Sequence, residues 1–194
     1  MPPFPIYTIG YGARELDALL SALRAHRIQF LIDVRSSPYS SYKPEYSQNA
    51  LQHFLEANGV RYVFMGDSLG GQPDDDEAYT DGKVDYEKLA GRPYFKAGIE
   101  RLRQANRQGQ RVVLMCSEGK PENCHRTKLI GRTLTAEGIE VVHIDEADEP
   151  ISQADVMLRL TGGQPSLFGD DFFNLTSRKR YRDTPRDAGE PEGG

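Results

Sequence analysis

The sequence has only two cysteines and no long apolar run. Two cysteines among 194 residues cannot form the disulfide framework of a small secreted domain, so we expect free thiols and a reducing, cytoplasmic setting. No apolar run approaches the ~20 residues that cross a bilayer, so we expect no membrane partner. The first ten residues, MPPFPIYTIG, hold no basic stretch followed by an apolar one, and we expect no signal peptide.

A strong positive charge is also missing. The formal net charge is -5, which excludes a protein that binds nucleic acid with its whole surface but leaves room for a local basic patch. With 38% hydrophobic and 27% charged residues, the chain suits one globular domain that buries a full core.

Apolar runs alternate with amphipathic runs along the chain. The runs that predict strands are residues 6–10, 30–34, 62–65, 112–116 and 141–144. Three junctions, ANGVRYVFM, RQGQRVVLM and AEGIEVVHI, place a glycine after a helix and then enter a continuous apolar run. This repetition predicts an α/β fold, a three-layer α/β/α (Rossmann-like) domain with a mainly parallel five-stranded sheet.

The domain boundaries follow from changes in composition. We expect the α/β domain to cover residues 1–160, with an irregular segment at 66–92 that is too long for an ordinary connection. We interpret this segment as an insertion on the active face or as a lid. From residue 161 the chain is rich in glycine, proline and charge, which predicts a flexible C-terminal tail over 161–194.

Candidate site residues follow from the rule that ligands of open parallel sheets bind beyond the carboxyl ends of the strands. The residues that this rule selects are Tyr11, Asp33, Arg35, Ser36, Pro38, Gly70, Cys116 and Glu118. Arg35 suits a phosphate or a carboxylate, although Asp33 and Arg35 also suit a buried pair that holds the loops. Asp33 and Glu118 are candidates for proton transfer.

The segment CSEGKPENCHR, from Cys116 to Arg126, holds both cysteines. Cys116 is a candidate nucleophile or redox thiol, since basic neighbours favour a thiolate; the alternative is a buried core residue. Cys124 suits a second redox thiol or the nucleophile itself. His125 suits a general acid or base, or alternatively a helix cap. Arg126 suits an anion ligand or an ion-pair partner. The spacing Cys-x7-Cys-His is unlike that of structural zinc sites, so we expect no metal and no cofactor.

Several motifs resemble a bacterial family called domain of unknown function 488. They are TIGYG, DVRSSPYS, LGG, LMCSEGKPENCHR and GIEVVHI, and they lie between about residues 7 and 144. The resemblance implies a three-layer α/β fold but no reaction. It also implies that these residues match the family's motif positions: Asp33, Arg35, Pro38, Cys116, Glu118, Cys124, His125 and Arg126.

A looser likeness is to rhodanese-type sulfurtransferases, which share an early LIDVR-like strand and a cysteine that closes a strand before a glycine-containing loop. The loop departs from theirs, because ten positions separate Cys116 from Arg126 and Pro121 lies between them. Persulfide and phosphocysteine chemistry are therefore not implied.

Two main functions fit these patterns. The first is an enzyme that uses a cysteine on an anionic substrate, with phosphate-bearing molecules and nucleotides as candidates. The second is a non-catalytic DNA-maintenance protein, because Gln164, Leu167 and Phe168 in GGQPSLFGDD resemble the short peptide with which bacterial repair proteins bind the sliding clamp. A sensor that binds an anionic ligand without turnover is a third interpretation.

Overall fold

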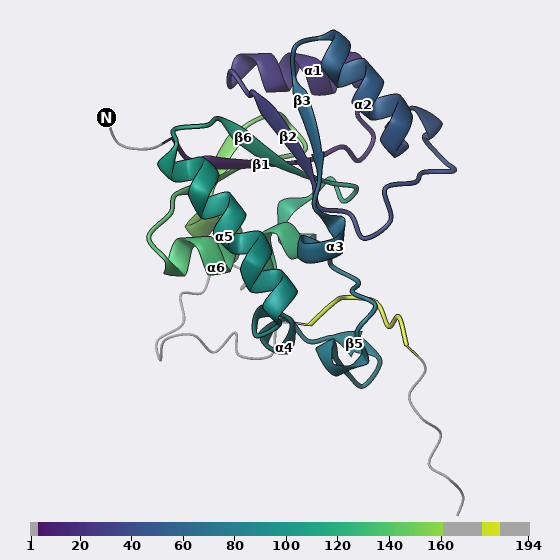
Figure 1. The fold of residues 1–194 in the computed structure, drawn as a ribbon, viewed down its shortest axis with the longest axis vertical. Coiled ribbons are helices and arrows are strands. Elements are labelled where there is room, and N and C mark those ends of the chain that lie inside the picture. The colour runs from purple at the N-terminus through teal and green to yellow at the C-terminus, as the bar shows by residue number, and fades with distance from the viewer. Residues whose placement is uncertain (1–3, 161–175, 183–194) are drawn as a thin grey trace, which may run out of the picture.

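The apolar runs form parallel strands at the centre of the molecule, with helices on both faces (Figure 1). The computed structural model describes residues 4–160 and 176–182. The strands are β1 (Ile6–Gly10), β2 (Phe30–Asp33), β3 (Arg61–Phe64), β4 (Tyr79–Thr80), β5 (Lys83–Val84), β6 (Val112–Cys116), β7 (Val141–Ile144) and β8 (Pro150–Ser152). The α-helices are α1 (Leu16–Ala25), α2 (Gln48–Ala57), α3 (Gly66–Leu69), α4 (Tyr86–Ala90), α5 (Pro93–Arg107), α6 (Arg132–Ala136) and α7 (Gln153–Leu160). Short 3-10 helices span Pro44–Tyr46, Asp76–Ala78 and Pro121–Asn123, and a π-helical segment spans Arg126–Gly131.

The central sheet has the order β3-β2-β6-β1-β7-β8 within the described residues. Its first five members pair in parallel, which confirms the predicted α/β class. The prediction of five strands was one short, because β8 pairs antiparallel with β7 at the edge. β8 has three residues and no apolar run, so no periodic signal marks it in the sequence.

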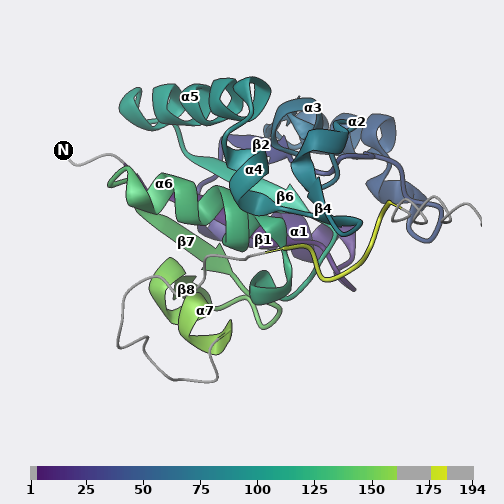
Figure 2. The ribbon, with the colours of Figure 1, turned by 90° about the horizontal axis from the view of Figure 1, so that it is seen from below.

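Two hydrophobic clusters cover the two faces of the sheet. Helices α1 and α2 bury their leucines against one face, and α5 and α6 pack on the other (Figures 1 and 2). The predicted glycine junctions are confirmed: Gly59, Gly109 and Gly138 follow their helices with φ of 79°, 67° and 80°, a region in which a side chain is strained. Among the described residues, no helix combines the length and the apolarity that crossing a bilayer requires.

The segment predicted to be an irregular insertion, residues 66–92, contains α3, a β4–β5 hairpin and α4. Ala78, Val84 and Leu89 are fully buried and belong to the same hydrophobic cluster as α5. The segment is therefore an ordered part of the domain. Its apolar residues are too widely and unevenly spaced for a helix or strand pattern, which is why the sequence suggests a loop.

Residues 176–182, here named the C-terminal strap, lie against the β4–β5 hairpin (Figure 2). The backbone N–H of Ser177 donates to the Val84 carbonyl at 2.9 Å, and the Val84 N–H donates to the Ser177 hydroxyl at 2.9 Å. Tyr181 N–H donates to the Gly82 carbonyl at 2.8 Å. The strap lies within the range 161–194, for which the sequence predicts a flexible tail, and these hydrogen bonds join it to the domain.

Candidate active site

Three neighbouring strands deliver side chains to one point of the sheet edge. β6 lies between β1 and β2, with Cys116 opposite Gly10 and Met115 opposite Asp33. The chain beyond β1 stays bound to the β6 end, since the Tyr11 N–H donates to the Cys116 carbonyl at 3.0 Å. Tyr11, Arg35 and Cys116 therefore meet at the carboxyl ends of the strands, where ligands of parallel sheets bind.

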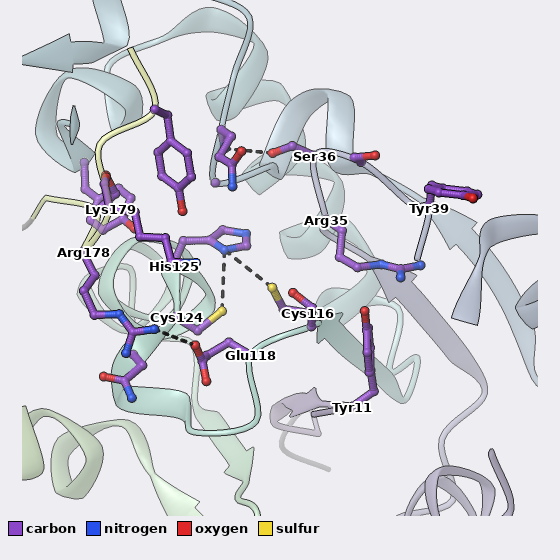
Figure 3. Close-up of a pocket in the computed structure, with 18 residues that line it drawn as sticks. Tyr11, Arg35, Ser36, Tyr39, Cys116, Glu118, Cys124, His125, Arg178 and Lys179 are labelled. Atoms are coloured by element: carbon purple, nitrogen blue, oxygen red, sulfur yellow. Dashed lines mark hydrogen bonds and ion pairs between the residues drawn. The ribbon is translucent and has the colours of Figure 1, made fainter. Parts of the chain in front are cut away.

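A cavity of about 340 Å³ opens at this point (Figure 3). Of the residues predicted from the sequence, its lining includes Tyr11, Arg35, Ser36, Cys116, Glu118, Cys124 and His125. Asp33, Pro38, Gly70 and Arg126 do not line it. Within the described residues the lining has three permanently basic side chains, Arg35, Arg178 and Lys179, against the single carboxylate of Glu118. The balance of charge favours an anionic ligand.

The two thiols and one imidazole form a buried group at the base of the cavity. The Nδ1 atom of His125 lies 3.9 Å from the Cys116 sulfur and 3.6 Å from the Cys124 sulfur (Figure 3). The Nε2 atom lies 3.2 Å from the Val34 carbonyl oxygen, which can only accept a hydrogen bond. Nε2 therefore carries a proton, and Nδ1 faces both sulfurs.

The two thiols differ in acidity because each affects the other. The neighbouring Cys124 thiol, together with the positive charges of His125 and Arg126, holds the pKa of Cys116 well below its ordinary value despite burial. Burial, and then the neighbouring negative charge of Cys116, raise the pKa of Cys124 well above its ordinary value. One thiolate and one thiol are the expected state.

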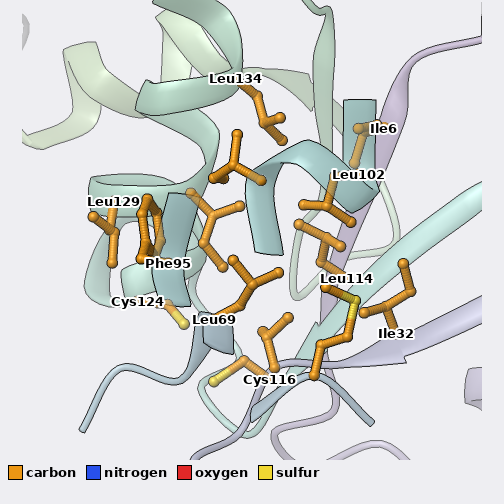
Figure 4. Close-up of a cluster of buried hydrophobic side chains, with 14 of the residues drawn as sticks. Ile6, Ile32, Leu69, Phe95, Leu102, Leu114, Cys116, Cys124, Leu129 and Leu134 are labelled. Atoms are coloured by element: carbon orange, nitrogen blue, oxygen red, sulfur yellow. The ribbon is translucent and has the colours of Figure 1, made fainter. Parts of the chain in front are cut away.

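Both cysteines also belong to the hydrophobic cluster beneath the cavity (Figure 4). Their residues are 7% and 4% exposed, so the interpretation of Cys116 as a core residue describes its packing correctly. Packing and chemistry are compatible here, because Cys116 and Cys124 line the cavity as well as the core.

Asp33 and Arg35 form the buried pair that the sequence left as an alternative. Arg35 Nε donates to Asp33 at 2.9 Å and Nη2 at 2.5 Å, and the Tyr62 hydroxyl donates to the same carboxylate at 2.7 Å. Arg35 Nη2 also donates to the Tyr46 carbonyl at 2.9 Å. The remaining Nη1 is buried without a hydrogen-bond partner. Asp33 is therefore a positioning residue, and Arg35, which lines the cavity, keeps one buried donor group without a hydrogen-bond partner.

Arg126 lies beneath the cysteine loop, fully buried, instead of facing a ligand. Its guanidinium donates to the carbonyl of Glu118 and, at 2.8 Å, to that of Gly119. The loop between the two cysteines curves around this side chain, so Arg126 sets the loop's shape. Arg126 lies ten positions after Cys116, which distinguishes this loop from a rhodanese loop. Here the arginine binds backbone carbonyls of the loop.

Ser36, Pro38 and Gly70 support the rim. The Ser36 hydroxyl accepts from the Gln72 N–H at 2.8 Å, and the Pro38 carbonyl accepts from the Gln48 N–H at 2.8 Å at the start of α2. A Cβ on Gly70 would meet the Ser36 side chain. The glycine therefore makes room for a side chain of the protein and not for a ligand.

The strap supplies site residues that the sequence patterns did not select. Ser177, Arg178, Lys179 and Tyr181 line the cavity, and Arg178 pairs with the Glu118 carboxylate at 3.4 Å. The basic run SRKRYR was the available signal, but nothing in the sequence ties it to a loop 60 residues earlier. The predicted clamp-binding residues Gln164, Leu167 and Phe168 lie outside the described residues, and clamp binding stays a prediction.

The family described as "Domain of unknown function DUF488" matches residues 15–133. The chain belongs to this family. The matched part of the DUF488 domain contains Arg35, both cysteines and His125, whereas Tyr11 and the strap lie outside it. No curated protein and no solved structure matches the chain. The likeness to rhodanese-type domains thus rests on sequence motifs alone.

Proposed function

We propose that the cavity is the active site of a cysteine-dependent enzyme that acts on a small anionic substrate. The observation that carries this proposal is the unpartnered Nη1 of Arg35, a buried cationic donor on a side chain that lines the cavity whose base holds Cys116. A buried donor without a partner costs free energy, and an anionic ligand would satisfy it. Free thiols at the site fit a reducing, cytoplasmic setting.

In this proposal Cys116 is the nucleophile and Cys124 its proton-bearing neighbour. The Cys116 sulfur forms a bond to an electrophilic atom of the substrate, and the bond to the leaving group breaks. The leaving group takes the electron pair and a proton from Cys124 or His125. Attack by water on the covalent intermediate then releases the product and restores the thiolate.

The short distance between the thiols supports a second candidate, a dithiol reductant. The ligating atoms of Cys116, Cys124 and His125 all lie within 4.8 Å of one another. Cys116 could attack one sulfur of a substrate disulfide and form a mixed disulfide with it. Cys124 could then attack the Cys116 sulfur and release the rest of the substrate. The substrate would leave with two thiols, and the protein would hold a Cys116–Cys124 disulfide.

The anion-binding claim is tested by alkylating Cys116 with a charged and a neutral reagent. Iodoacetate carries a carboxylate beside the reactive carbon, and iodoacetamide has an uncharged amide there. If the lining binds anions, the ratio of the iodoacetate rate to the iodoacetamide rate at Cys116 should exceed the ratio for the same thiol in unfolded protein, and inorganic phosphate should slow both reactions. Equal ratios in folded and unfolded protein, with no effect of phosphate, would overturn the proposal.

A further inference from the structure

The three ligating atoms at the base of the cavity have the spacing of a metal site. A tetrahedral zinc ion with Zn–S of about 2.3 Å and Zn–N of about 2.0–2.1 Å separates sulfur from nitrogen by about 3.6 Å and sulfur from sulfur by about 3.8 Å. His125 Nδ1 lies 3.9 Å from Cys116 Sγ and 3.6 Å from Cys124 Sγ, and no two of these atoms are more than 4.8 Å apart. An ion can contact all three after small rotations of side chains.

The contacts that hold the His125 ring are also those of a typical metal-ligating histidine. A metal-bound imidazole usually donates its other ring N–H to a carbonyl or carboxylate, which sets the tautomer and aims the ring. Here Nε2 donates to the Val34 carbonyl at 3.2 Å and Nδ1 faces the two sulfurs, so a neutral His125 imidazole would offer its Nδ1 lone pair to an ion between them. Gly71 confines the ring, since a Cβ on that glycine would lie 2.7 Å from the His125 Cγ atom.

Burial and access complete the site. Cys116, Cys124 and His125 are each at least nine-tenths buried, yet all three line the cavity. A cation bound to them would have protein on one side and the cavity on the other, so its fourth position would be open to water or a ligand. Two thiolates would balance the charge of a divalent ion, and thiolate with imidazole favours zinc over the hard cations magnesium and calcium.

We infer that Cys116, Cys124 and His125 form a binding site for a thiophilic divalent cation, with Zn²⁺ as the preferred ion and an open fourth position facing the cavity. Binding requires both sulfurs as thiolates and uses one lone pair from each. Metal coordination lowers the nucleophilicity of the Cys116 sulfur, so metal binding competes with its thiol chemistry. This inference needs only the three ligands and does not rest on the proposed function. It replaces the expectation from sequence spacing that no metal binds.

Metal affinity of the full chain tests the inference. Zn²⁺ is titrated against a chromophoric chelator with wild-type protein and with Cys116→Ser, Cys124→Ser and His125→Ala. The wild type should bind one ion per chain, and each variant should lose affinity by ~100-fold or more, since even second-shell changes cost about 10- to 100-fold. His53→Ala, an exposed histidine on α2, should retain wild-type affinity. Co²⁺ should give a thiolate charge-transfer absorption in wild-type protein that weakens when either cysteine is replaced.

The wild type alone also decides the question if a variant fails to fold. Zn²⁺ should protect both thiols from iodoacetamide, and EDTA should restore their reactivity. Equal Zn²⁺ affinity in wild type and Cys124→Ser, or no charge-transfer band and no protection in wild type, would overturn the inference. Alkylation of metal-free protein reports separately on the proposed function: a reactive Cys116 in a protein that does not bind Zn²⁺ refutes the metal site alone, and an inert Cys116 in a protein that does bind Zn²⁺ refutes the nucleophile alone.

Discussion

The guanidinium of Arg178 lies 3.4 Å from the carboxylate of Glu118, so an ion pair joins the C-terminal strap to the loop that follows Cys116. The two side chains are 57% and 35% exposed, which limits their contribution to stability to roughly 0–1 kcal/mol. Both side chains line the cavity, so under the proposed function we expect the pair to affect ligand binding more than folding.

Replacing Arg178 should therefore change anion recognition and leave the fold intact. We expect Arg178→Gln to lower the rate of Cys116 alkylation by iodoacetate by about fivefold, which corresponds to roughly 1 kcal/mol, and to leave the iodoacetamide rate unchanged. Arg61→Gln, at the amino end of β3 on the far edge of the sheet, is the matched control. If Arg178→Gln slowed both reagents equally, the strap would control access and not charge.

The buried pair of Asp33 and Arg35 should be strongly coupled in stability. Arg35→Met leaves a buried carboxylate without its cation, and we expect a loss of about 3–5 kcal/mol in the free energy of unfolding. Adding Asp33→Asn to that variant removes the unpaired charge and should recover part of the loss. Urea unfolding of the two single variants and the double variant measures the coupling; additive losses would show that the pair is not coupled.

His143 should make the protein less stable in mild acid. Its Nδ1 accepts from the Thr8 hydroxyl at 2.7 Å, its Nε2 donates to the Gln153 side-chain oxygen at 2.7 Å, and burial lowers its pKa to about 4. An unfolded chain binds the proton near the ordinary value of about 6.5, so stability is complete above that pH and falls as the pH drops toward 4. At pH 5 the loss should be about 2 kcal/mol relative to pH 8.

The loss should be measured by urea unfolding of wild type and His143→Gln across this pH range. Glutamine does not titrate, so the loss of about 2 kcal/mol between pH 8 and pH 5 should disappear in the variant. His53→Gln, a change at an exposed histidine, should keep the wild-type slope. Parallel curves for wild type and His143→Gln would contradict the prediction.

Gly71 should be needed for the position of His125. A methyl group at Gly71 would press on the ring of His125, and movement of the ring would remove positive charge from beside Cys116. We expect Gly71→Ala to raise the apparent pKa of Cys116 by about one unit, measured from the iodoacetamide alkylation rate against pH. Gly119→Ala, in the cysteine loop itself, places its methyl at an ordinary 3.7 Å from Gly12 and should react like wild type.

Much of the fold was predictable because local patterns specify it. The apolar runs and the glycines after α2, α5 and α6 mark the parallel strands and their junctions, and the strand ends then bring Cys116 and Arg35 to one rim. The strap was not predictable, since the bonds between Ser177 and Val84 join residues 93 positions apart. Arg126 donates to backbone carbonyls, and a sequence does not distinguish such an arginine from one that binds a ligand.

The acidity of Cys116 is the property on which the proposed chemistry depends most directly. It is measured by the iodoacetamide alkylation rate of each cysteine against pH, in metal-free native protein, with mass spectrometry to separate the two sites. We predict that Cys116 reacts with an apparent pKa well below the ordinary ~8.5 and that Cys124 reacts with an apparent pKa above it. If both thiols titrate at or above the ordinary value, or neither reacts until the protein unfolds, the nucleophilic role of Cys116 is contradicted.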